Sequence, residues 1–189
     1  MPVPAFDPGS LADQLLGRRI VLLARELDDD VAAETCSRLL LLAAEDPHRP
    51  VTLQILSPGG SPVAAMTVHD TMRTLGPDVA TVAAGSLAGP VPFLVAAGTP
   101  GRRTALPHAM ALPTGDGPVS GSHPGDVRVR AEHLTTRRTE IEELTNRYCG
   151  APLPGDARER WLSAQDMLRY GIVDEIRGSA QRMTGRADS

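Results

Sequence analysis

Serines and histidines are the residues of this chain that could together attack an ester or amide carbonyl. Ser86 follows Gly85 at the end of an apolar run, and His69 and His108 are imidazoles that could accept its proton. His123 lies in a stretch rich in Gly, Ser and Pro, which is typical of a solvated loop. A serine at a strand-to-helix turn is more often a helix cap than a nucleophile. We therefore expect Ser86 to be a cap, with catalysis by Ser86 as an alternative.

Residue types and spacing exclude several other mechanisms. All 19 basic residues are arginine, which removes Schiff-base, Ser-Lys and P-loop chemistry. Cys36 and Cys149 lack the CxxC spacing of a zinc site and indicate no disulfide framework, in keeping with a reducing cytosol. The first residues lack the basic-then-apolar layout of a signal peptide. We expect no metal, no cofactor and a cytoplasmic location.

The composition of the 189 residues predicts one globular domain, residues 1–189. Hydrophobic residues make up 41% of the chain and charged residues 22%, which is enough apolar surface for a packed core. The net charge is -4, and no basic run is long enough to bind phosphates, so nucleic acid is not an expected partner.

One uncharged stretch, residues 79–98, reaches the length of a membrane span. Gly85, Gly89, Pro90 and Pro92 interrupt it, as expected for a buried strand, a turn and a short helix. We expect no membrane partner.

Alternating strand and helix patterns predict an α/β fold with a parallel sheet. The expected strands are residues 19–23, 51–56, 79–84, 104–106, 109–112 and 172–176. The expected helices are residues 28–45, 61–76, 89–98, 126–149 and 163–170. Residues 1–17 are an N-terminal segment, and residues 114–125 and 178–189 are expected to be flexible.

The order of seven short motifs carries more information than any one of them. The motifs are Ser57-Pro-Gly-Gly, Asp70-Thr-Met, Pro77-Asp-Val, Gly101-Arg-Arg, Leu106-Pro, Trp161-Leu-Ser-Ala and Tyr170-Gly-Ile-Val-Asp. Together, from about Gln14 to Ile176, they resemble the proteolytic subunit of the Clp protease, ClpP. The resemblance implies the ClpP/crotonase-like fold of repeated β-β-α units. It also implies a tetradecamer of two seven-membered rings stacked through a long handle helix, here residues 126–149.

The same resemblance places the serine-protease triad on residues that cannot perform its chemistry. The nucleophile position is Gly89, which has no side chain, and the histidine position is Thr114, which cannot accept a proton near pH 7. The aspartate position is Glu159, which could orient an imidazole but meets none. Of the two backbone amides expected to hold the oxyanion, Gly60 retains its N–H, and Pro90 has no N–H.

Two further surfaces follow from the resemblance. The handle carries an apolar stripe that suits contact between rings or, alternatively, packing within its own domain. The stripe consists of Val127, Ala131, Leu134, the aliphatic stem of Arg138, Ile141 and Leu144. The positions that match the ATPase-docking pocket are mostly polar and lack the aromatic anchors of such pockets: Thr52, Gln54, Val82, Thr104, Leu106 and Arg177. We expect docking of a Clp ATPase to be weak or absent.

The sequence thus predicts an inactive ClpP-like subunit, structural or regulatory, in a ring with an active paralogue. One alternative is a peptidase that uses Ser86 with His108 or His69. Another is a free-standing homo-oligomeric binding protein. An acyl-CoA enzyme of the crotonase type is disfavoured because Pro90 removes one of its paired amides.

Overall fold

The computed structural model describes residues 8–113 and 124–178. Its main sheet has five parallel strands in the order β1-β2-β3-β5-β8. These strands are β1 (Ile20–Leu23), β2 (Val51–Ile55), β3 (Val79–Ala83), β5 (Arg103–Ala105) and β8 (Glu175–Ile176). A second sheet has the order β4-β6-β7 and comprises β4 (Ser86–Ala88), β6 (Met110–Leu112) and β7 (Leu162–Ser163).

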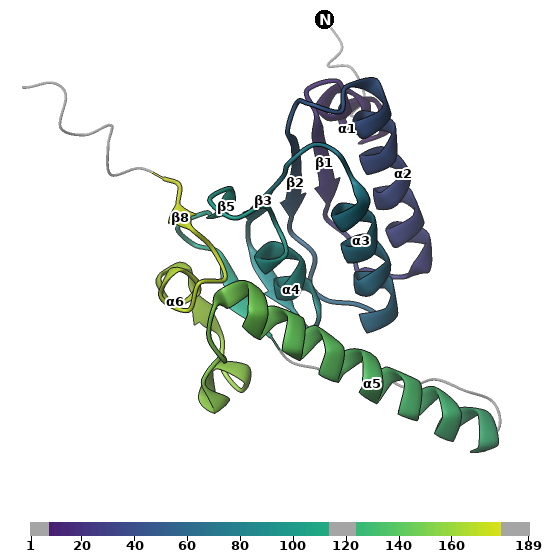
Figure 1. The fold of residues 1–189 in the computed structure, drawn as a ribbon, viewed down its shortest axis with the longest axis vertical. Coiled ribbons are helices and arrows are strands. Elements are labelled where there is room, and N and C mark those ends of the chain that lie inside the picture. Colours follow the sequence, from purple (N-terminus) through teal and green to yellow (C-terminus); the bar gives the residue numbers. More distant parts are fainter. Residues whose placement is uncertain (1–7, 114–123, 179–189) are drawn as a thin grey trace, which may run out of the picture.

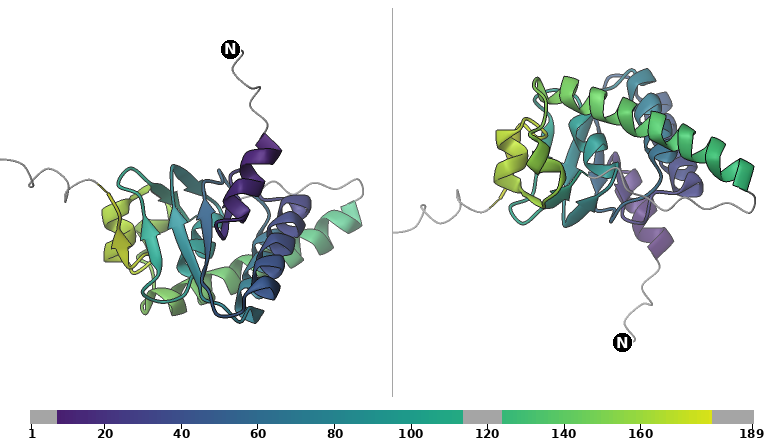
Figure 2. Two further views of the ribbon diagram at one scale, coloured as in Figure 1. Left: turned by 90° about the horizontal axis from the view of Figure 1, so that it is seen from above. Right: turned by 90° about the horizontal axis from the view of Figure 1, so that it is seen from below.

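The helices lie mainly on one side of the main sheet, and α5 extends past the body of the molecule (Figure 1). They are α1 (Pro8–Leu16), α2 (Asp29–Glu45), α3 (Pro62–Thr74), α4 (Val91–Ala96), α5 (Pro124–Cys149) and α6 (Ala164–Arg169), with a 3₁₀ helix at Gly155–Arg158. Figure 2 shows α5 running across the ends of the other elements. None of the helices in the described ranges is long and apolar enough to cross a membrane.

Alternating burial along the strands explains this one-sided arrangement. In β2, Val51, Leu53 and Ile55 are fully buried, whereas Thr52 and Gln54 are half-buried. The same alternation occurs in β3. Because successive side chains of a strand point to opposite faces, one face of the sheet packs on helices and the other is partly open.

The predicted helix starts are confirmed at three caps. The Asp28 side chain accepts a hydrogen bond from the Val31 N–H at 2.8 Å, and Ser61 caps α3 with Pro62 at its first position. Ser163 and Asp166 form the predicted capping box at the start of α6. The long helix predicted at 126–149 is present as α5.

Two predicted boundaries are wrong. The helix predicted to begin at Gly89 begins at Val91, because Gly89 has a left-handed φ of 62° and Pro90 is the N-cap. Residues 86–88, before this turn, form the separate strand β4. The strand predicted at 172–176 is reduced to β8, because the N–H groups of Ile172 and Val173 donate to the Met167 carbonyl at the end of α6. These two residues are buried in that turn and do not pair in the sheet.

Candidate functional site

The Gly60 backbone lies against β-bridge partner Leu27, and its geometry admits only glycine. Its φ is 146°, and an added Cβ would overlap the Leu27 backbone. The Leu27 N–H donates to the Gly59 carbonyl at 2.9 Å, and the Ser61 N–H donates to the Leu27 carbonyl at 2.7 Å. Gly60 is the central residue of its segment in this parallel bridge, and the N–H of such a residue points away from the partner segment. No acceptor among the described residues binds the Gly60 N–H, which is free to meet a ligand.

Gly89 and Pro90 form the turn between β4 and α4. Gly89 has a left-handed φ of 62°, and its N–H donates to the Leu112 carbonyl at 3.0 Å. Pro90 is the N-cap of α4, and Pro92 lies in the first turn of the same helix. Neither proline has an N–H, and the Phe93 N–H donates to the Pro90 carbonyl at 3.2 Å. The helix start therefore offers few amides to an anion.

The second sheet brings the chain segments of the expected triad to one of its ends. Ala88, just before Gly89, pairs with Leu112, and β6 pairs antiparallel with β7. Because Ala111 pairs with Leu162 in this antiparallel pair, the chain enters β7 at the end of the sheet from which it leaves β6. Thr114 lies outside the described residues, two positions after Leu112. The structure thus places Gly89 and the segment of Glu159 around the same end of this sheet.

Glu159 itself is exposed at the end of the 3₁₀ helix. Its side chain meets no hydrogen-bond partner in the part of the chain that the structure describes. The organised carboxylate nearby is Asp166, which accepts a hydrogen bond from Arg160 at 3.1 Å. That hydrogen bond and those from Ser163 lower the pKa of Asp166 to about 2. Asp166 is therefore a helix-capping anion at neutral pH.

The alternative nucleophile Ser86 is exposed on β4, opposite Met110. His108 lies in the turn before β6 and is also exposed. Within residues 8–113 and 124–178, neither side chain takes part in a hydrogen bond. His123 lies outside the described residues. The structure therefore shows no Ser–His pair at Ser86, and it does not show the expected helix cap there either.

His69 is a buried residue of α3, and both its ring nitrogens are engaged. Nε2 lies 2.7 Å from the Tyr148 hydroxyl and Nδ1 lies 2.9 Å from the Asp70 carboxylate. The ring also packs against Phe93, with centroids 4.9 Å apart. His69 thus joins α3 to α4 and α5 and is not positioned as a free base.

The structure joins two of the seven motifs, Gly101-Arg-Arg and Tyr170-Gly-Ile-Val-Asp, to which the sequence analysis assigned no role in the site. Arg103 Nε and the Arg103 backbone N–H each donate to Asp174 at 3.0 Å, and Arg103 Nη1 donates to the Tyr148 carbonyl at 3.1 Å. The guanidinium is nearly buried and lowers the pKa of Asp174. Neither spacing nor composition signals this contact, because the partners are 71 residues apart.

The expected ATPase-docking positions lie on strands of the main sheet or directly after them. Thr104 is buried, whereas the others are half-buried or exposed. Gln54, Val82 and Thr104 form one register row across β2, β3 and β5, and Thr52 lies two residues before Gln54. Leu106, half-buried, follows β5, and the exposed Arg177 follows β8.

Two of these docking positions enter a polar network with Glu175. The Thr104 hydroxyl donates to Glu175 Oε1 at 3.1 Å, and Arg177 donates to the same oxygen at 3.0 Å. At β5 and β8 the docking positions are therefore polar.

The expected handle has two different halves. Ile141 and Leu144 are half-buried against the core, and Thr145 is buried. Leu134 is also half-buried, whereas the side chains of Val127 and Ala131 lie outside the described ones. The last turns of α5 pack within the molecule, and its first turns extend past the body (Figure 1).

Comparisons with known proteins identify the family. The Clp protease family model matches residues 9–180. The chain belongs to the Clp protease family. It is 42% identical over 182 residues to the ATP-dependent Clp protease proteolytic subunit 2 of Mycolicibacterium paratuberculosis, covering 93% of this chain and 90% of that protein. Proteolytic subunit 1 of Streptomyces coelicolor is 38% identical over 196 residues, covering 98% and 89%. Proteolytic subunit 2 of Nocardia farcinica is 38% identical over 180 residues, covering 93% and 89%.

Membership of the Clp protease family confirms the resemblance read from the seven motifs. The α/β fold with its parallel sheet and helices is consistent with the ClpP fold, as predicted.

Proposed function

We propose that this Clp protease homologue is a non-hydrolytic subunit, structural or regulatory, of a ClpP-type ring. One observation carries the proposal: the turn that should present the nucleophile and an oxyanion amide consists of Gly89 and Pro90. Glycine has no nucleophilic atom, and proline has no N–H.

The expected loss of activity is large. Removing a triad serine typically lowers kcat by about 10⁶-fold, and the remaining rate depends mainly on the oxyanion hole and substrate binding. Of the two expected oxyanion donors, the Gly60 N–H is present, but Pro90 supplies no second N–H. We therefore propose that the residual rate falls still further.

The partner is a second chain with an intact triad. Clp protease proteolytic subunits normally form rings that work with Clp ATPases, and α5 supplies a long helix that extends past the body. We propose that α5 contacts the opposite ring and that this subunit dilutes the active sites of a mixed assembly. The whole chain acts as one domain in the cytoplasm.

Docking of an ATPase through this subunit is proposed to be weak. The supporting observation is the polar network at β5 and β8, in which the exposed side chains of Glu175 and Arg177 interact and the buried Thr104 hydroxyl donates to Glu175. A partner's apolar side chain placed there would desolvate the carboxylate and the guanidinium without replacing their hydrogen bonds.

Two experiments test the proposal. The chain purified alone, treated with a fluorophosphonate probe and a fluorogenic peptide, should be neither labelled nor active. Labelling that disappears in Ser86→Ala would establish the alternative nucleophile and overturn the proposal. Co-expression with an intact-triad ClpP, followed by native mass spectrometry, should show mixed rings. Rings that contain this chain alone would favour the homo-oligomeric binding protein.

A further inference from the structure

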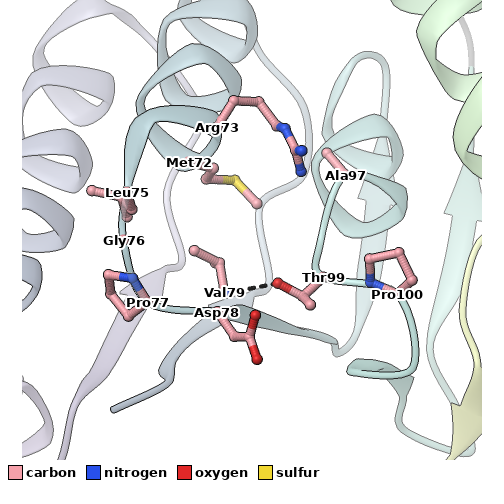
Figure 3. Close-up of a pocket in the computed structure, with 10 residues that line it drawn as sticks. All are labelled: Met72, Arg73, Leu75, Gly76, Pro77, Asp78, Val79, Ala97, Thr99 and Pro100. Carbon is pink, nitrogen blue, oxygen red and sulfur yellow. Dashed lines mark hydrogen bonds between the residues drawn. The ribbon is translucent and has the colours of Figure 1, made fainter. Parts of the chain in front are cut away.

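We draw no further inference here: the strongest candidate, the hollow between the turn that joins α3 to β3 and the turn that leads from α4 to β5 (Figure 3), carries nothing, because its apolar residues Met72, Val79 and Ala97 are already buried by the protein and only the exposed side chain of Arg73 is left to bind a ligand.

Discussion

His69 Nε2 and the Tyr148 hydroxyl oxygen lie 2.7 Å apart, although the two residues are separated by 79 positions in the chain. With Nδ1–H directed to Asp70, Nε2 accepts the hydrogen bond of the phenol. The pair fastens the last turn of α5 to α3, beside the Phe93 ring of α4. Together with the hydrogen bond from Arg103 to the Tyr148 carbonyl, it holds the base of the long helix.

Tyr148→Phe should loosen that base. The substitution leaves a buried imidazole nitrogen without its partner, which costs about 1–3 kcal/mol. Urea unfolding should show this loss, and hydrogen exchange should become faster in residues 141–149. Tyr170→Phe is the matched control, because its hydroxyl meets the partly exposed Arg160 and should change stability by less than about 1 kcal/mol. Equal effects of both variants would contradict the special role of the His69 contact.

Acid should destabilise the fold through Asp174. Its pKa is lowered in the folded state, chiefly by the hydrogen bonds from the Arg103 side chain, so the folded protein binds this proton less readily than the unfolded chain. The stabilisation is complete above the unfolded pKa of about 3.9 and is lost as the pH falls through the lower folded value.

Thermal unfolding followed by circular dichroism between neutral pH and about pH 2.5 checks this. Asp174→Asn should be less stable than the parent at neutral pH, and the difference should shrink as the pH falls. Asp78→Asn, which removes an exposed ion pair with Arg102, is the control and should change little at any pH. A constant gap between Asp174→Asn and the parent would show that Asp174 does not titrate in this range.

The main sheet could be predicted because its signals are local. Val51, Leu53 and Ile55 alternate with polar residues, and Asp28 and Ser61 stand before helices as caps. In the second sheet only β6 corresponds to a predicted strand, residues 109–112. The strands β4 and β7 could not be predicted, because they have three and two residues and pair with segments far along the chain.

The same distinction holds for the candidate site. The resemblance supplied Gly60, Gly89, Pro90 and Glu159, but the contact of Gly89 with Leu112 depends on the pairing of β4 with β6. No local pattern reveals that Arg103 and Asp174 meet.

Gly60→Ala should damage the fold. The new Cβ would overlap the Leu27 backbone, and neither of the two segments can move without breaking the bridge. We therefore expect the free energy of unfolding to fall by at least about 2 kcal/mol. Gly155→Ala is the control: no atom lies within 4 Å of its added Cβ, and stability should change by less than about 0.5 kcal/mol. The free energies of unfolding of both variants, measured with a chemical denaturant, check this prediction. If the prediction holds, retention of Gly60 follows from packing and is no sign of a working oxyanion site.

Gly89→Ser should not create a protease. The new hydroxyl would sit on a backbone with φ of 62°, a conformation that costs a non-glycine residue about 1–3 kcal/mol. It would also lack an imidazole, since Thr114 occupies the expected histidine position, and the amide that Pro90 cannot supply. We expect no fluorophosphonate labelling of this variant.

Labelling should need the combined change Gly89→Ser, Pro90→Met and Thr114→His, because the base and the second amide act with the nucleophile as one unit. The double variant Pro90→Met and Thr114→His, which keeps Gly89, is the control and should stay unlabelled. If Gly89→Ser alone reacted as fast as the triple variant, the amide at residue 90 and the base at residue 114 would have no part in the chemistry. The proposed cause of inactivity would then reduce to the missing hydroxyl.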